Sequence, residues 1–395
     1  MKKTILFVMN KLVCGGAEKS LISLLESIDY SQYEVDLLLF KQEGLFLNKV
    51  PKQVNLLEEP SGYKYFDMPI KTAILNNVTM GRFDIALSRI LAGYIFKSEK
   101  NIARCEQRVW KYISNSLNTI NKRYDIAIGF MEKNPIYFCI DKVDAKKKIG
   151  FIHSDYEMLG MDAKIDKNYL EKLSKIVTVS EESANILKRK FTNLSSRIKV
   201  MHNIVSPKII KKLSLENVNF QSKSITITSV GRLNYVKGYD LAIDACEMLI
   251  NDGYDIQWLI IGEGEERKKL EQLIKDKGLE KNFILLGIQE NPYPYVRKSD
   301  LFVQSSRFEG KSIAIDEAKI LHKPIVVTNF KTAKDQITNM VNGIIVEMDS
   351  KSIYMGIKTI INSKELREKI VSNLAIENLG TESEINILYE IINDK

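Results

Sequence analysis

The sequence has 395 residues, which is too long for one ordinary hydrophobic core and predicts two domains. A hydrophobic content of 45% is normal for a globular protein, and a net charge of +8 favours anionic partners such as small phosphorylated molecules, phospholipid head groups or nucleic acid, or simply keeps the chain in solution. The four cysteines are far apart, which argues against a disulfide framework or a cysteine metal site and fits a reducing cytoplasm. No apolar run is long enough to span a bilayer.

The N-terminal segment reads as a strand, a glycine turn and a helix. Residues 4–9 form an apolar run that is short for a signal peptide and leads into Asn10 without a cleavage-type site, so we interpret it as a buried strand. Gly15 and Gly16 follow, and then leucines and isoleucines recur at helical spacing. Gly16 would let the turn approach a phosphate or hydroxyl at the helix N-terminus. A tight turn without a ligand is an equally good interpretation.

A second strand is predicted over residues 34–40, and the pattern then changes. Between about 60 and 120 no strand is evident, and apolar residues recur at helical spacing around residues 85–95. Basic residues predominate in this region: Lys64, Lys71, Arg82, Arg89, Lys97, Lys100, Arg104, Arg108 and Lys111. A basic amphipathic helix suggests a membrane surface or an anionic acceptor, whereas the alternative is a helix that packs on the first domain with a solvated basic face.

Four more strands are predicted before the middle of the chain, over residues 124–130, 148–153, 175–180 and 197–201. Ser180 has the position of a helix cap. His153 ends one of these strands and could face a ligand, although a structural histidine is the commoner case. Three histidines in all are too few and too scattered for a metal site.

Residues 206–223 are polar and predict a linker, after which strands and helices alternate again. The predicted strands are 224–230, 257–261, 282–287, 300–304, 324–328 and 343–346. This alternation is typical of a parallel, doubly wound sheet. Arg232 and Lys237 bracket the turn after the first of these strands, where a guanidinium fork and a mobile ammonium suit a diphosphate. The alternative is two surface cations.

The stretch from Ser305 to Ala318 joins an apolar strand to a helix through a short loop. Ligands bind at the carboxyl ends of strands in open α/β sheets, where helix N-termini offer backbone N–H groups. Glu309 lies in the loop and Glu317 in the helix, and carboxylates accept hydrogen bonds from the paired hydroxyls of a sugar or ribose. Taken alone, two such glutamates are more often a loop charge and a solvated helix face, and only the other motifs of the chain reverse that.

These motifs together resemble a known family. Gly15-Gly16-Ala17-Glu18, Gly231-Arg232 with Lys237-Gly238, Gly262-Glu263-Gly264, and Glu309-Gly310 with Glu317-Ala318 occur in the order found in family 4 retaining glycosyltransferases of the GT-B fold. Residues 309–319 and 323–328 look like members that build bacterial capsular and other surface polysaccharides. The resemblance covers the second domain and the first N-terminal turn, and it is weak from about 45 to 120.

The resemblance implies an α/β fold with two Rossmann-like, parallel-sheet domains facing a crevice. It implies an acceptor domain over residues 1–205, a donor domain over 206–375, and a C-terminal helical segment over 376–395 that packs back on the first domain. It also implies roles for single residues. Glu309 would hold donor-sugar hydroxyls, Glu317 the ribose, and Arg232 and Lys237 the diphosphate. Gly16, Gly310 and the amides of Lys311, Ser312 and Ile313 would assist, and His153 would lie near the transferred sugar.

One position departs from the family pattern, because many members carry small or aromatic residues where this chain has Lys311-Ser312. Lys311 could join the phosphate clamp or lean outward, so the donor cannot be read from it.

The function implied is a retaining hexosyl transfer from a nucleotide-diphosphate sugar, a UDP-sugar first of all, to a saccharide or lipid-linked acceptor, at the inner face of the membrane. The resemblance implies front-face attack assisted by the leaving phosphate, with no metal and no further cofactor. Two alternatives are a GT-B epimerase or inverting transferase, and a non-catalytic partner subunit of a transferase. The retained Arg232, Lys237, Glu309 and Glu317 argue against both. Nucleic-acid binding would need stacking aromatics among the basic residues, and these are too sparse.

Overall fold

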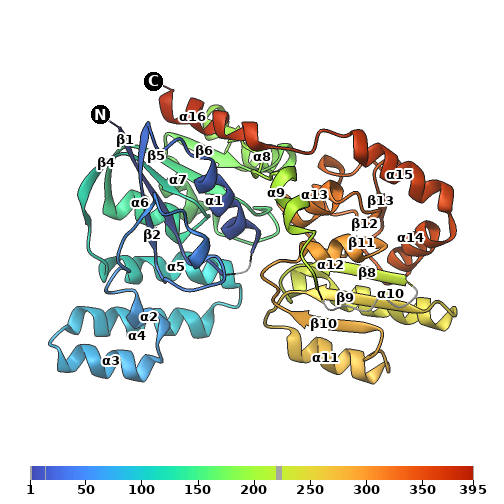
Figure 1. Ribbon diagram of the computed structural model, residues 1–395. Helices are drawn as coiled ribbons and strands as arrows, with labels where there is room; N and C mark the ends of the chain where they lie inside the picture. Colours follow the sequence, from blue (N-terminus) through green and yellow to red (C-terminus); the bar gives the residue numbers. More distant parts are fainter. Residues whose placement is uncertain (1, 14, 219–224, 395) are drawn as a thin grey trace. The chain divides into compact units, whose positions relative to one another are not determined.

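A computed structural model describes residues 2–13, 15–218 and 225–394. The chain divides into two compact units (Figure 1). The first contains the N-terminal strand, residues 17–202 and the C-terminal helix from residue 384, and the second contains Gly15, Gly16 and residues 203–383. Both are built on parallel sheets, as the alternation of strands and helices predicts.

The first unit has a seven-stranded sheet in the order β3-β2-β1-β4-β5-β6-β7, with every pair parallel. The strands are β1 (Lys3–Met9), β2 (Tyr33–Leu39), β3 (Asn55–Leu56), β4 (Ile120–Gly129), β5 (Val143–Ile152), β6 (Lys175–Thr178) and β7 (Ile198–Val200). All were predicted except β3, whose two residues are too few to give a periodic pattern. The order reverses between β1 and β4, which marks the place where a doubly wound sheet opens to ligands.

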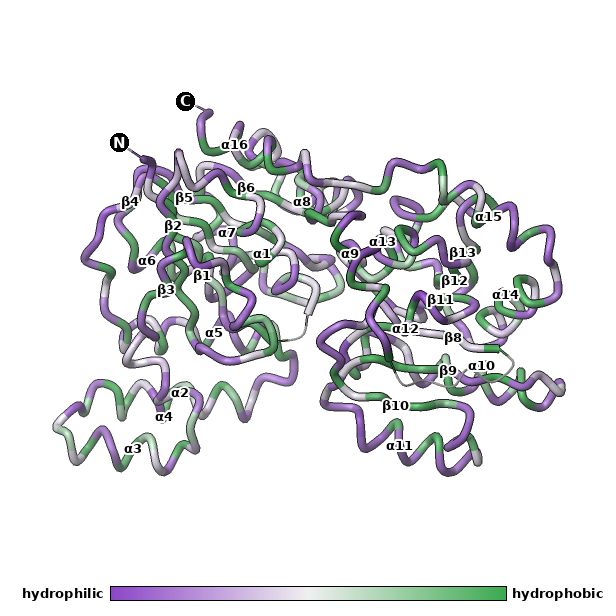
Figure 2. Tube along the Cα trace, in the orientation of Figure 1, coloured by the Kyte–Doolittle hydropathy of each residue, from purple (hydrophilic) through white to green (hydrophobic). Residues whose placement is uncertain are grey.

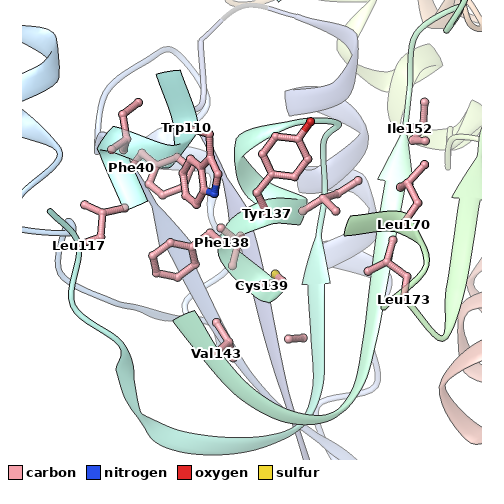
Figure 3. Packing of buried hydrophobic residues seen from close by; sticks show 14 of the residues in the cluster. Phe40, Trp110, Leu117, Tyr137, Phe138, Cys139, Val143, Ile152, Leu170 and Leu173 are labelled. Atoms are coloured by element: carbon pink, nitrogen blue, oxygen red, sulfur yellow. The ribbon is translucent and has the colours of Figure 1, made fainter. Parts of the chain in front are cut away.

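Helices cover both faces of this sheet. They are α1 (Gly16–Ser27), α2 (Lys64–Asp67), α3 (Ile70–Thr79), α4 (Phe83–Ser98), α5 (Ile102–Asn115), α6 (Asn134–Lys142), α7 (Ala163–Leu170) and α8 (Glu181–Lys190). Ser180 caps α8 as predicted, because its hydroxyl accepts a hydrogen bond from the Ser183 amide at 3.2 Å. Aromatic side chains from α5 and α6, together with Phe40 directly after β2, fill the core (Figure 3). The largest buried one, Trp110, donates its indole N–H to Asp141 at 2.8 Å, so its polar atom is satisfied.

Helices α3 and α4 lie side by side as an antiparallel pair at the edge of the first unit (Figure 1). Their buried faces include Ala73, Ile85 and Ala92. A Cβ on Gly93 of α4 would lie 2.3 Å from the end of the Ile70 side chain, so a larger residue there would require that side chain to move.

The second unit has a six-stranded parallel sheet in the order β10-β9-β8-β11-β12-β13. The strands are β8 (Ile225–Val230), β9 (Ile256–Ile261), β10 (Phe283–Gly287), β11 (Leu301–Gln304), β12 (Ile325–Thr328) and β13 (Ile344–Val346). The helices are α9 (Pro207–Leu213), α10 (Tyr239–Asn251), α11 (Arg267–Asp276), α12 (Tyr293–Lys298), α13 (Ile313–Ile320), α14 (Ser350–Asn362) and α15 (Lys364–Ile376). The strand order reverses between β8 and β11.

The segment between the two sheets differs from the prediction. The predicted linker of residues 206–223 contains a helix, α9, which begins at Pro207 and buries Ile210; residues 219–224 lie outside the described part of the chain. Proline pre-sets the first helical turn, a signal that the polar composition masked. The C-terminal helix α16 (Ile385–Asn393) belongs to the first unit, where Tyr389 stacks on Tyr33 with ring centroids 5.2 Å apart.

Candidate active site

The candidate site of the second unit lies at the carboxyl ends of β8 and β11, the neighbouring strands at which the order of the sheet reverses. The β8 loop carries Arg232 and Lys237, and the β11 loop carries Glu309 and Gly310. Adjacent parallel strands bring their carboxyl ends to the same edge. Two loops that are about seventy residues apart in sequence therefore meet.

Gly238 lets the two loops touch. It has φ 62°, a left-handed conformation, and a Cβ there would lie 2.1 Å from the carbonyl oxygen of Ser305. The Ser305 hydroxyl donates to the carbonyl of Lys237 at 2.8 Å, and the Asn234 side chain caps the short turn of residues 235–237. The backbone of Lys237 is thus fixed against the β11 loop.

Lys237 and Glu309 form an ion pair, with 2.5 Å between Nζ and Oε1. Their side chains are 17% and 14% exposed, so the pair is shielded while still reaching solvent. The same Oε1 accepts hydrogen bonds from the Ser306 hydroxyl at 2.6 Å and from Gln304 Nε2 at 3.0 Å. The structure therefore brings together Lys237 and Glu309, two of the residues that the sequence singled out.

The loop around Glu309 is braced on two sides. Arg307 lies 4.1 Å over the Tyr235 ring and pairs with Asp240 at 2.6 Å, which holds the pKa of that carboxyl below its usual value although burial opposes the shift. Thr332, after β12, donates to the carbonyl of Glu309 at 3.0 Å. These contacts fix the loop by side chains from three different segments.

Gln336 holds the start of α13. Its Oε1 accepts from the Ser312 amide at 2.9 Å, and its Nε2 donates to the Ser312 carbonyl at 2.7 Å and to Asp316 at 2.8 Å. The Ser312 amide, one of the three expected to assist with a diphosphate, is therefore already engaged in this structure. Lys311 is only 11% exposed and lies 3.9 Å from Asp316, so it leans toward α13 rather than outward.

Glu317 is 5% exposed, which excludes the solvated helix face as its environment. Its Oε1 accepts a hydrogen bond at 3.0 Å from the hydroxyl of Tyr293, a residue of α12. A carboxylate is kept in such a position only when it is paired or hydrogen-bonded.

The other predicted site residues of this unit differ in exposure. Arg232 is exposed, whereas Gly310 and Ile313 are buried.

In the first unit, His153 directly follows β5, as predicted. Its ring packs against Phe130 and Phe151, and Nε2 is buried without a hydrogen-bond partner among the described residues. Burial lowers the pKa of His153 to about 4, although the nearby Glu132 opposes the shift. The imidazole is therefore neutral at pH 7. Glu132 accepts from the His153 amide at 3.1 Å and from the Ser154 hydroxyl at 2.7 Å.

Gly16 is the first residue of α1, directly after the turn that follows β1, and it has no left-handed φ. Within the described part of the chain, no three His, Cys, Asp or Glu side chains gather as a metal site would require. Among the same residues, no helix is long and apolar enough to cross a membrane.

Comparison with known proteins decides what the second unit is. Residues 211–375 match the family model described as Glycosyl transferases group 1. This part of the chain is a group 1 glycosyl transferase domain. The match includes both loops that form the Lys237–Glu309 pair, and the family resemblance read from the motifs is confirmed there.

Curated relatives that match this chain are glycosyltransferases by name. An N-acetylgalactosaminyltransferase of Campylobacter jejuni, named for a diphospho-undecaprenol acceptor, is 31% identical over 195 residues, which are 49% of this chain and 52% of that protein. Poly(ribitol-phosphate) alpha-N-acetylglucosaminyltransferase of Staphylococcus aureus is 25% identical over 307 residues, 76% of this chain and 57% of that protein. The chain thus spans about half the length of the curated relatives it matches.

Solved structures confirm the predicted fold class. HepE of Anabaena, solved in complex with UDP and glucose, superposes with a TM-score of 0.69 over all of both chains at 18% identity. The fold is GT-B, with the group 1 domain as its second parallel-sheet unit.

Several side chains that fix the site of the glycosyl transferase domain were not singled out from the sequence. They are Gln304, Ser306, Tyr293, Asp240 and Gln336. Gln304 could have been found, because a polar residue closes the otherwise apolar strand β11 at its carboxyl end. Tyr293 and Gln336 gave no signal, since they reach the site from segments whose proximity only the fold creates.

Proposed function

We propose that this chain is a glycosyltransferase of surface polysaccharide biosynthesis that transfers a sugar from a nucleotide-diphosphate donor, with UDP-sugars as the first class to test, to a saccharide or lipid-linked acceptor. The observation that carries the proposal is the Lys237–Glu309 pair at the strand-order reversal of a domain that matches the group 1 model. The names of the relatives support the substrate class: the Campylobacter enzyme is named for a diphospho-undecaprenol acceptor, and HepE was solved with UDP.

In the proposed reaction, the cations of the β8 loop hold the diphosphate. Arg232 is exposed and offers a planar fork, and the Lys237 ammonium has three N–H groups, so it can keep Glu309 and still donate to a phosphate. As the bond between the anomeric carbon and the phosphate breaks, negative charge develops on the leaving diphosphate, and fixed cations stabilise it. Glu309 would accept a hydroxyl of the donor sugar, and Glu317 would accept the ribose.

We propose retention at the anomeric carbon, as the family resemblance implies. We propose front-face attack rather than a covalent intermediate, because none of the described contacts sets a carboxylate apart as a nucleophile and Glu309 is engaged with three donors. The acceptor hydroxyl would attack from the face that the diphosphate leaves and would give its proton to a phosphate oxygen. His153 stays neutral at pH 7 and would contribute a neutral ring rather than a charge. The reaction as proposed uses no metal and no further cofactor.

We also propose that the protein works in the cytoplasm at the inner face of the membrane. Helix α4 carries an exposed apolar stripe at helical spacing, made of Phe83, Leu87, Ile90, Leu91 and Tyr94, with exposures between 40% and 75%. Figure 2 shows that hydrophobic residues recur along α3 and α4. Exposed lysines flank the stripe at the end where α3 begins and α4 ends: Lys71, Lys97 and Lys100. An apolar stripe beside cations suits an anionic bilayer surface.

The structure shows that several basic residues of this region are not available for the proposed contact with a membrane surface. Arg89 is 8% exposed and donates to the backbone carbonyls of Tyr65 and Met68, so it holds α4 in place and is not a surface charge. Arg104 donates to the carbonyl of Gly160, and Arg108 pairs with Glu99 at 2.8 Å. The basic pattern of the sequence thus includes arginines with structural roles.

The reaction is tested with a panel of nucleotide sugars. UDP-glucose, UDP-galactose, UDP-N-acetylglucosamine and UDP-N-acetylgalactosamine, with GDP- and dTDP-sugars beside them, are assayed for slow donor hydrolysis and for thermal stabilisation of the protein. Hydrolysis of one UDP-sugar, with free UDP as product and undiminished rate in EDTA, is the expected result. Absence of hydrolysis together with absence of stabilisation by every member would overturn the proposed function. Stabilisation without hydrolysis would favour a non-catalytic partner subunit.

A further inference from the structure

The two oxygens of the Glu309 carboxylate have different surroundings. Oε1 accepts from three donors, Lys237 Nζ at 2.5 Å, Ser306 Oγ at 2.6 Å and Gln304 Nε2 at 3.0 Å. No described residue donates a hydrogen bond to Oε2. The carboxylate is therefore anchored through one oxygen and presents the other, while its side chain is still 14% exposed.

Gln304 is held in one orientation. It is 4% exposed at the end of β11, and its Nε2 donates to the Ser306 hydroxyl at 2.6 Å as well as to Glu309. Its Oε1 is buried with no hydrogen-bond partner among the described residues. A flipped amide would place Oε1 against the carboxylate, which only accepts, so the two donations determine the orientation despite the unpaired oxygen.

Ser306 completes the arrangement. It is fully buried, accepts from Gln304 and donates to Glu309, so its single hydroxyl hydrogen points at the carboxylate. Neither residue depends on Lys237. If a diphosphate draws the ammonium away from Glu309, Gln304 and Ser306 still hold Oε1.

We propose that Gln304 and Ser306 are positioning residues for sugar transfer: they fasten Glu309 through Oε1, so that Oε2 alone accepts one hydroxyl of the donor sugar. This inference rests on the proposed function and adds to it how the donor sugar is selected. A site that hydrogen-bonds a substrate hydroxyl rejects an analogue that lacks it, because the protein acceptor is then left unpaired.

The first test separates positioning from folding. Gln304→Met keeps the volume of the side chain and removes both donations. We expect a kcat about tenfold lower for the nucleotide sugar that the panel identifies, with the KM and the Kd of free UDP within twofold of wild type. Ser306→Ala should act in the same direction and serves if Gln304→Met does not fold. A wild-type kcat in a folded Gln304→Met or Ser306→Ala protein would overturn the proposal.

Ser299→Ala is the matched control, because Ser299 is 2% exposed in the same unit and its hydroxyl donates to the Val296 carbonyl. It removes a buried serine hydroxyl away from Glu309 and should leave kcat unchanged. A loss equal to that of Ser306→Ala would attribute both effects to general destabilisation and would count against positioning.

The second test uses the monodeoxy analogues of the same donor. In wild type, one analogue should lose at least about tenfold in kcat/KM, and in Gln304→Met that loss should shrink to below about threefold, because the contact no longer discriminates. Equal losses in wild type and Gln304→Met would overturn the positioning role. If the losses in kcat/KM for two different analogues both shrink in Gln304→Met, both carboxylate oxygens bind the sugar. That result would contradict the proposal that Oε2 alone accepts one hydroxyl.

Failure of the proposed function would look different, since wild type would then hydrolyse no nucleotide sugar. A separate experiment measures the interaction between Gln304 and Glu309: the urea unfolding midpoints of Gln304→Met, Glu309→Gln and the double variant are compared with wild type. Non-additive shifts of the unfolding midpoint are expected because the two side chains touch, and additive shifts would refute the contact itself.

Discussion

The carboxyl ends of the two sheets differ in what their side chains do. In the second unit, charged groups meet: Lys237 pairs with Glu309, and Arg307 pairs with Asp240. In the first unit, a neutral His153 lies among aromatic rings, and the exposed feature is the apolar stripe of α4. In the second unit the described charges are paired with one another, and in the first unit a neutral ring and an apolar helix face stand out. Under the proposed function, the contrast teaches that a diphosphate sets strict demands on charge, whereas an acceptor would be met mainly by shape and apolar surface.

The largest effect is expected from removing the cations of the second unit. Lys237→Ala and Arg232→Ala should each lower the transfer rate by about a hundredfold or more, because the charge that develops on the leaving diphosphate loses a fixed partner. Steady-state kinetics checks this, with thermal unfolding to show that both proteins fold. Lys268→Ala, an exposed lysine of α11, is the control and should retain the wild-type rate. Near-wild-type turnover in both variants would contradict the role of these cations, and with it the proposed difference between the two units.

The two glutamates should separate nucleotide binding from sugar binding. Glu317→Gln should weaken binding of free UDP by about tenfold to a hundredfold, since a hydrogen bond to a charged group is worth about 1.5–3 kcal/mol. Glu309→Gln should leave UDP affinity within about twofold while lowering transfer strongly. Isothermal titration calorimetry gives both values.

Glu280→Gln, on an exposed position of the same unit, is the matched control for the loss of one carboxylate. Equal UDP affinity in wild type and Glu317→Gln would contradict the ribose role of Glu317. A strong loss of affinity in Glu309→Gln would mean that its carboxylate faces the nucleotide.

The sequence predicted much of the second unit because its candidate site residues lie beside the strands that place them. Lys237 and Glu309 each follow an apolar run by a few residues, so the order of strands was enough to bring them to one edge. The partners of Glu317 and Ser312 were not predictable, since Tyr293 and Gln336 come from other segments. Their roles in donor binding remain predictions.

Less of the first unit could be predicted from the sequence, because buried and exposed basic residues look alike in sequence. Arg89 and Lys97 have the same charge and occur on one helix, yet Arg89 donates to two backbone carbonyls while Lys97 is exposed. The helix α9 was missed for a similar reason, because a polar segment with Pro207 at its first turn reads as a linker by composition. Local pattern fixes elements well, but it does not tell which charges they bury.

A third prediction concerns the neutral histidine of the first unit. The pKa of His153 is lowered to about 4, against about 6.5 in an unfolded chain, so the unfolded state binds more protons between these pH values. The folded state should therefore lose about 2 kcal/mol of stability as the pH falls from 6.5 toward 4.5, and this loss should be absent in His153→Gln. Urea unfolding of both proteins at pH 7.5 and 4.5 measures the difference. If the free energy of unfolding depends on pH in the same way in both proteins, the His153 ring protonates freely in the folded state and is more accessible to water than its packing indicates.

The smallest effects are expected at the membrane contact, because each lysine near an anionic surface contributes about 1 kcal/mol. Wild type should sediment with phosphatidylglycerol vesicles at low salt and be released at high salt. Lys71→Glu, Lys97→Glu and Lys100→Glu together should abolish sedimentation and spare donor hydrolysis, since these lysines lie in the other unit from the Lys237–Glu309 pair.

The matched control carries the same change of net charge in the second unit, as Lys268→Glu, Lys351→Glu and Lys369→Glu, all at exposed positions. If the docking were a response to net charge, both triple variants would release the vesicles equally. If the stripe of α4 contributes as proposed, Leu87→Ser and Leu91→Ser should weaken binding even at low salt, where charge alone would suffice. Wild type that stays free of anionic vesicles at low salt would leave the first unit with a soluble acceptor and the basic face with no role beyond solubility.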